Sequence, residues 1–154
     1  CAGDYMDGYS CGDLDVLYDL INMNFLHTNF NLDLGDNEDD NGNINLNDFY
    51  DINSLSVSDI FTILSLETGW FNSVGKLDYL SLNNKNIYYI PESIGNLDAL
   101  NDLFLSNNVL TSLPATICNL NDDCEIFVQD NRICNTQECI DGPTIHFGLQ
   151  ECNE

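Results

Sequence analysis

The stretch LDYLSLNNKNI at residues 77–87 recurs twice further along the chain. Its counterparts are LNDLFLSNNVL at residues 100–110 and DCEIFVQDNRI at residues 123–133, so the period is 23 residues. In the first copy Leu80 and Leu82 alternate with polar residues, which predicts a short strand with one apolar side. One such strand cannot bury its apolar side alone, so we expect the three to stack as a parallel sheet.

A second motif fills the spaces between these strands. IPESIGNL at residues 90–97 and LPATICNL at residues 113–120 share the form L-P-x-x-I-x-x-L, in which proline starts a turn or a short helix. The two motifs together resemble the short leucine-rich repeats of plant and bacterial surface proteins, across about residues 64–134. The resemblance implies an α/β fold, a short solenoid in which Asn108 and Asn131 close the turns after the strands.

Both ends of such a solenoid need a cap, and the chain offers one at each end. Residues 12–24 carry apolar side chains at helical spacing, and Ser10 with Asp13 resembles a capping box, which predicts an N-terminal helical cap. Residues 25–47 are rich in Asn and Asp and look like an insertion. We therefore divide the chain into an N-terminal cap (1–56), the repeats (57–134) and a C-terminal cysteine cap (135–154).

Seven cysteines, two near the start and five from Cys118 onward, predict disulfide-rich caps and an extracellular or cell-surface location. Cys118 with Cys124 and Cys1 with Cys11 are close enough in sequence to pair locally, but sequence does not settle the connectivity. The C-terminal cysteines have poor spacing for zinc. The opening Cys-Ala-Gly-Asp resembles the start of a processed bacterial lipoprotein, so a lipid anchor at Cys1 is one option and an ordinary cystine partner the other.

The charge balance excludes some partners. Three basic residues against 26 acidic ones leave a net charge of −23, and such a surface repels nucleic acid and anionic lipid. No stretch approaches the roughly 20 apolar residues of a membrane span. The charge favours solubility or, alternatively, the recruitment of cations or of a basic partner.

Residues 37–48 contain one candidate calcium loop. EF-hand and dockerin loops place oxygen ligands at positions 1, 3, 5, 7, 9 and 12 and glycine at position 6. The segment meets these positions in residue type, with an atypical asparagine at position 1; the alternative is a solvated acidic loop. The predicted Ca²⁺ ligands are Asn37, Asp39, Asn41, Asn43, Asn45 and Asp48.

The outward-facing positions of the repeats predict a binding surface. They stack in columns across the strands, and Phe104 and Phe127 are adjacent in one of them. Aromatic anchors among polar residues are typical of protein-binding patches; the alternative is that the two rings only stack on each other. The candidate ligand-binding residues are Tyr79, Ser81, Asp102, Phe104, Glu125, Phe127 and Gln129.

These patterns predict a binding module that recognises a protein or glycan ligand through this surface. The alternative is a structural subunit of a filament, coat or other extracellular assembly, which binds copies of itself. His27 and His146 lie at opposite ends of the chain and no G-x-S-x-G motif is present, so we expect no enzymatic activity.

Overall fold

The computed structural model describes residues 3–24, 56–136 and 138–152. The predicted calcium loop at residues 37–48 and the lipid anchor considered at Cys1 lie outside these described residues, so both stay predictions. Within the described ranges, no helix combines the length and the apolar character that crossing a bilayer requires.

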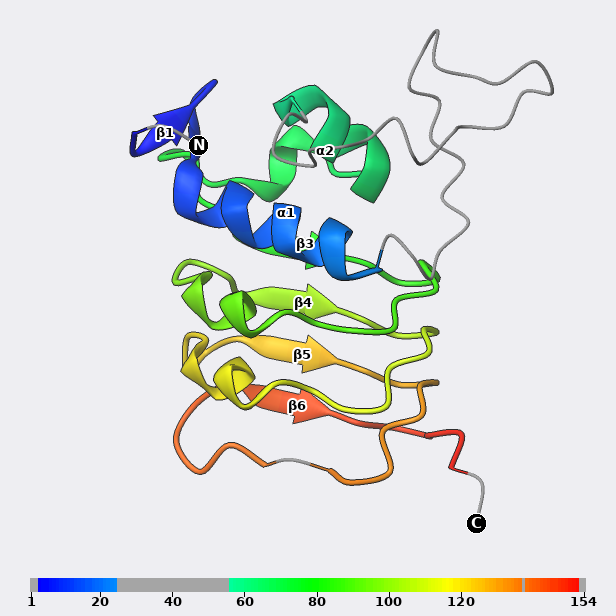
Figure 1. Cartoon of the computed structure of the whole chain (residues 1–154). Coiled ribbons are helices and arrows are strands. Elements are labelled where there is room, and N and C mark those ends of the chain that lie inside the picture. The colour runs from blue at the N-terminus through cyan, green and yellow to red at the C-terminus, as the bar shows by residue number, and fades with distance from the viewer. Residues whose placement is uncertain (1–2, 25–55, 137, 153–154) are drawn as a thin grey trace, which may run out of the picture.

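A four-stranded parallel sheet forms one layer of the fold, in the order β3-β4-β5-β6 (Figure 1). Its strands are β3 (Tyr79–Ser81), β4 (Asp102–Phe104), β5 (Glu125–Phe127) and β6 (Thr144–His146). The first three lie where the repeats predicted them, with Tyr79 opposite Asp102 and Asp102 opposite Glu125. The prediction of a mixed α/β fold built on a parallel sheet is confirmed.

The fourth strand, β6, was not predicted. Thr144 pairs with Glu125, an offset of 19 residues instead of the 23 that separate the earlier strands. The segment that we assigned to a cysteine cap therefore also contributes a strand to the sheet. Its offset and its turn residue, Gln150 in place of asparagine, hide it from the repeat pattern.

The inward side of the sheet builds the hydrophobic core. Leu80, Leu103 and Ile126 are opposite one another in the register and are fully buried. The residues on either side of each are only half-buried, so the predicted alternation holds in every repeat. Burying each of these side chains contributes about 2 kcal/mol to stability.

A column of side-chain amides closes the turns that follow β4, β5 and β6. Each amide nitrogen donates to the carbonyl three residues earlier and to a carbonyl of the preceding repeat, and each amide oxygen accepts a backbone N–H. Asn108 Nδ2 donates to Leu82 and Leu105, at 2.9 Å each, and Oδ1 accepts from Ile87 at 2.9 Å; Asn131 Nδ2 donates to Leu105 at 2.8 Å and Val128 at 3.0 Å, and Oδ1 accepts from Leu110 at 3.0 Å.

Gln150 continues this column after β6. Its Nε2 donates to the carbonyls of Val128, at 2.7 Å, and Phe147, at 2.6 Å, and its Oε1 accepts the N–H of Ile133 at 3.0 Å. The longer glutamine side chain thus makes the bonds that asparagine makes in the repeats before it. Buried backbone groups at the turns are satisfied by side chains in three successive units.

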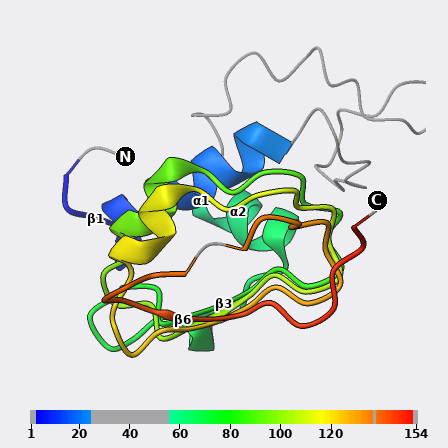
Figure 2. The same cartoon turned by 90° about the horizontal axis from the view of Figure 1, so that it is seen from below.

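Two 3-10 helices lie across from the sheet and follow the two prolines of the second motif. They are η4 (Glu92–Asn96), after Pro91, and η5 (Ala115–Asn119), after Pro114. Figure 2 shows them as the green and yellow ribbons beside α1, in the layer opposite the strands. They pack so closely that a Cβ on Gly95 would lie 2.4 Å from the carbonyl oxygen of Thr116.

The N-terminal helix was predicted at residues 12–24 and is observed as α1 (Cys11–Asn24). The Asp13 N–H donates to Ser10 Oγ at 3.5 Å, which is one half of the predicted capping box. The other half is not formed, since the Ser10 N–H donates to the Gly75 carbonyl at 2.7 Å and Asp13 Oδ1 accepts the Ser10 hydroxyl at 3.2 Å. A hairpin of β1 (Tyr5–Met6) and β2 (Tyr9–Ser10) precedes α1. The helix α2 (Val57–Leu64) and the 3-10 helix η3 (Thr68–Trp70) lie between α1 and β3 in the described sequence.

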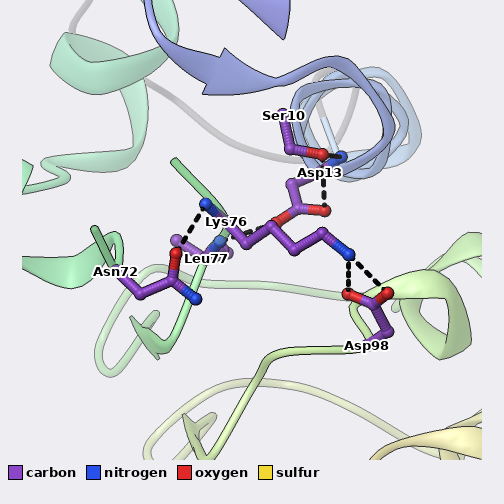
Figure 3. A network of polar contacts seen from close by, with 6 residues as sticks. All are labelled: Ser10, Asp13, Asn72, Lys76, Leu77 and Asp98. Atoms are coloured by element: carbon purple, nitrogen blue, oxygen red, sulfur yellow. Dashed lines mark hydrogen bonds and ion pairs between the residues drawn. The ribbon is translucent and has the colours of Figure 1, made fainter. Parts of the chain in front are cut away.

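Hydrogen bonds fix α1 to the first repeat at both ends of the helix. At its start, Asp13 Oδ2 accepts the Leu77 N–H at 2.6 Å, and Figure 3 shows this carboxylate between Ser10 and Leu77. At its end, buried Asn24 accepts the Tyr88 N–H at 2.8 Å and donates to the Tyr89 carbonyl at 2.8 Å. Asp13 is only 3% exposed, and this burial raises the pKa of its carboxyl above the ordinary value.

The disulfides contradict one of the two local pairs that the sequence offered. Cys118 bonds Cys139 and Cys134 bonds Cys152, so the predicted Cys118–Cys124 pair is wrong. Cys124 is a free thiol, fully buried in the hydrophobic core just before β5, because its predicted partner in η5 is bonded to Cys139 instead. Cys11 is disulfide-bonded, and the Cys1 of its predicted pair lies outside the described residues.

Candidate functional site

The half-buried outer side of the sheet carries the residues that we predicted to bind a ligand. The register aligns Tyr79, Asp102 and Glu125 in one column and Ser81, Phe104 and Phe127 in the next. β6 extends these columns with Thr144 and His146. Gln129 lies just beyond β5, where its Oε1 accepts the Ser106 hydroxyl at 2.6 Å. We call this surface the ladder face and define it as the seven predicted residues together with Trp70 and His146.

Aromatic rings form a continuous row across the ladder face. Trp70 lies 5.2 Å from Tyr79, and Tyr79 lies 5.2 Å from Phe104, measured between ring centroids. Phe104 and Phe127 stack at 4.8 Å and 5° from parallel, and Phe127 and His146 stack at 4.6 Å and 11°. The two phenylalanines thus stack on each other, and both remain half-buried.

This stacking decides which part of each ring meets solvent. Strands in a sheet lie about 4.8 Å apart, so rings opposite one another in a parallel register cover each other's faces. Both faces of Phe127 are covered, one by Phe104 and one by His146. The exposed part of Phe127 is therefore the ring edge.

Sequence reasoning did not include His146 and Trp70 in this surface. His146 lies on the strand that the repeat period did not reveal, while Trp70 precedes the first repeat. Searching residues 135–154 for a strand of the form apolar-x-apolar, with an amide side chain at the turn, would have found Ile145, Phe147 and Gln150. Aligned on Ile126, that pattern places His146 opposite Phe127.

His146 also bonds an acidic residue of the ladder face. Its Nε2 is hydrogen-bonded to Glu125 Oε2, on the neighbouring strand. The His146 and Glu125 side chains are 40% and 46% exposed, so the pair is open to solvent. The last ring of the row is thus held both by its stacking on Phe127 and by a carboxylate.

The negative charge of Asp102, in the same column as Glu125, is not balanced by a partner within the described residues. Asp102 lies directly opposite Glu125 on the same side of the sheet, and no hydrogen bond or ion pair joins its side chain to the part of the chain that the structure describes. Like charges directly opposite each other on neighbouring strands are destabilising. The ladder face therefore carries an unfavourable local concentration of negative charge.

The basic side chains of the chain are engaged elsewhere. Lys76 Nζ donates to Asp98 Oδ1 at 2.7 Å, and Lys85 Nζ donates to Ser65 Oγ at 2.8 Å. Arg132 lies 3.8 Å from Glu151. Each of these three cations thus contacts a residue outside the ladder face.

The predicted calcium ligands cannot be placed, since all six lie outside the described residues. Among residues 3–24, 56–136 and 138–152, no group of three or more His, Cys, Asp or Glu side chains is arranged to hold a metal ion. Calcium binding and the expected lack of enzymatic activity both stay predictions.

No protein-family model matches the chain, and no curated protein or solved structure gives a significant match.

Proposed function

We propose that this chain is an exported leucine-rich-repeat solenoid that binds a protein or glycan through its ladder face. The observation that carries the proposal is the row of five aromatic rings, from Trp70 to His146, left half-buried across the sheet. Solubility alone favours polar side chains on an open sheet face. Aromatic residues in a polar surround are the usual anchors of binding surfaces.

Three features support the solenoid. The strand register advances by 23 residues twice, from Tyr79 to Asp102 and from Asp102 to Glu125. The same amide-to-backbone bonds recur at Asn108, Asn131 and Gln150. The 3-10 helices stack on each other opposite the strands, as the repeating units of a solenoid do.

Two features support caps and export. Helix α1 lies over the first repeat and is hydrogen-bonded to it through Asp13 and Asn24. The disulfides Cys118–Cys139 and Cys134–Cys152 join the segment around β6 to the repeats before it. Disulfides persist in oxidising compartments, so their presence favours an extracellular or cell-surface location.

A capture experiment with two matched double variants tests the proposal. The full chain is immobilised and exposed to extracellular extract, and bound proteins and glycans are quantified. In the ladder variant Phe104→Ser/Phe127→Ser we expect at least a tenfold loss of the captured species. The control Ile140→Ser/Leu149→Ser removes two apolar side chains that are 97% and 82% exposed and lie outside the ladder face, and should retain capture. Equal capture by the ladder variant and the wild type would sink the proposal.

A structural subunit that binds copies of itself remains the second candidate, and one observation favours it. β6 is an edge strand of the sheet, and exposed Ile140 and Leu149 flank it within four residues on either side. Edge strands with apolar neighbours are prone to pair with other chains.

Light scattering coupled to size exclusion distinguishes this candidate from the first. A self-assembling subunit would show a mass that rises with concentration and returns to that of a monomer in Ile140→Ser/Leu149→Ser. A binding module would stay a monomer of about 17.3 kDa at all concentrations. The loop at residues 37–48 is tested by measuring the melting temperature with calcium and with a chelator, because calcium binding should raise it.

A further inference from the structure

We propose that the occupant of the ladder face is a polypeptide segment that carries both apolar and basic side chains, and not a glycan. This inference rests on the proposed function, since it names the class of ligand for the same surface. Two observations carry it: the direction in which the rings face, and the uncompensated carboxylate of Asp102.

The covered ring faces argue against a sugar. The face of an aromatic ring is electron-rich and its edge is electron-poor, so the C–H groups of a sugar pack on a ring face. Phe127 has no free face, and Phe104 has one face against Phe127 and the other beside Tyr79. The middle of the ladder face therefore lacks the platform that carbohydrate stacking requires. It offers a strip of apolar ring edges instead, against which aliphatic side chains can pack.

The same geometry determines where a cation can bind. A cation–π contact also needs a free ring face, so an ammonium or guanidinium group gains little from the stacked rings themselves. The carboxylate of Asp102 lies in the column beside them, half-buried and without a charged partner in the described residues. A basic side chain placed there would form a charge-assisted hydrogen bond and relieve the repulsion between Asp102 and Glu125.

The overall charge points to the same partner. The net charge of −23 attracts basic molecules and repels acidic ones at a distance, which speeds the encounter with a basic segment. The column on the other side of the rings is neutral: Asn83 Oδ1 accepts the Ser106 N–H at 2.7 Å, and Ser106 Oγ donates to Gln129. The ladder face is thus acidic along one border, apolar in the middle and amide-rich along the other, which suits an extended peptide.

Defined probes test this inference on the full chain. The first is an end-capped peptide that alternates lysine with leucine; the matched peptides alternate lysine with serine and glutamate with leucine. A neutral linear pentasaccharide represents glycans. Calorimetric titration of the wild-type chain should give binding to the lysine–leucine peptide at least about tenfold tighter than to either matched peptide, and no binding to the sugar up to about 1 mM.

Two variants assign this binding to the ladder face. Asp102→Asn should lower the affinity for the lysine–leucine peptide about fivefold and make that affinity depend less on salt. Its control, Asp122→Asn, removes the same charge from an exposed residue outside the ladder face and should change affinity less than twofold. Phe104→Leu/Phe127→Leu keeps apolar side chains on the sheet and should therefore still fold. Because it removes the ring edges, it should also lower the affinity for the lysine–leucine peptide.

The outcomes separate this inference from the proposed function. If the pentasaccharide binds, and Phe104→Leu/Phe127→Leu abolishes that binding while the peptides do not bind, the inference is overturned and the ladder face remains a binding site. If Asp102→Asn and Asp122→Asn lower the affinity for the lysine–leucine peptide equally, binding depends on net charge alone and the inference is also overturned. If the wild-type chain binds neither the peptides nor the sugar, the inference and the proposed function both fail.

Discussion

The ring of Phe127 lies 4.8 Å from the ring of Phe104 and only 5° from parallel with it. This separation is that of neighbouring strands, so the sheet itself sets the stack. The two residues are 23 positions apart in the chain, which is the period of the repeat. One sequence feature therefore produces both the fold and the row of rings on its surface.

The stack should contribute to stability as well as to binding. We expect a double-mutant cycle of Phe104→Leu and Phe127→Leu to give a favourable coupling of about 0.5–1.5 kcal/mol in the free energy of unfolding, measured by urea denaturation. A second cycle of Phe127→Leu with Tyr89→Leu, a residue with no ring contact to Phe127, provides the control. Equal coupling in the two cycles would contradict a specific contribution from stacking.

Asn131 should be one of the most sensitive polar residues. It is 1% exposed and its amide makes hydrogen bonds to four backbone groups, of Leu105, Leu110, Val128 and Gln129. Asn131→Ala removes the acceptor of the buried Leu110 N–H, while the carbonyls of Leu105 and Val128 each keep one other side-chain donor, from Asn108 and Gln150. We expect it to lower the free energy of unfolding by about 1–3 kcal/mol. Asn135→Ala, at an exposed position, should change it by less than about 0.5 kcal/mol. A loss of the same size in both variants would show that the amide column does not hold the turns.

The buried carboxyl of Asp13 should make stability depend on pH. Burial raises its pKa above the ordinary 3.8, because removal from water disfavours the carboxylate. The folded chain then binds this proton more tightly than the unfolded chain. Its contribution to stability is complete below pH 3.8 and is lost as the pH rises through the raised folded pKa.

The variant Asp13→Asn has no ionisable group at this position and should therefore lose the contribution of Asp13 to the pH dependence of stability. The free energy of unfolding of the variant minus that of the wild type should therefore rise between about pH 3 and about pH 7, whatever constant offset the altered hydrogen bonds add. Asn135→Ala, at an exposed position that carries no titratable group, is the control, and its difference should stay flat. A difference that falls with pH in Asp13→Asn would refute the assigned direction of the pKa shift.

The thiol of Cys124 should be protected from alkylation. Its burial raises the pKa to about 12, with the nearby charges of Asp102 and Glu125 adding to the effect, so almost no thiolate forms near pH 8. We expect iodoacetamide to leave Cys124 unmodified in the folded chain and to modify it fully in denaturant without reductant, as measured by mass spectrometry of its peptide. Failure to react in denaturant would mean that Cys124 is disulfide-bonded after all.

The parts of the fold that sequence predicted well are those determined by periodicity. The alternation around Leu80, Leu103 and Ile126 determined which side of each strand is buried, and the repeat spacing determined their register. The helical spacing and the Ser10–Asp13 cap located α1 to within one residue. The strand β6 was not predicted because its offset of 19 residues breaks the period, although Gln150 makes the bonds that asparagine makes in the repeats.

Contacts made in three dimensions were beyond sequence reasoning. Cys118 and Cys124 are six positions apart but occupy different layers, whereas Cys139 reaches Cys118 only because the chain returns beneath the last repeat. The ladder-face columns were predictable from the register, but the orientation of the rings was not, since it depends on side-chain rotamers. That orientation is the observation from which we propose a peptide, and not a glycan, as the ligand.

Nuclear magnetic resonance titration of the ¹⁵N-labelled full chain with the lysine–leucine peptide is the most direct test of the ladder face as a binding site. We predict that the backbone amides whose signals shift most belong to β3, β4, β5, β6 and the turns after them, with Phe104, Phe127 and His146 among them. Shifts concentrated on α1 and the 3-10 helices η4 and η5, in the opposite layer, with the strand signals unchanged, would contradict it.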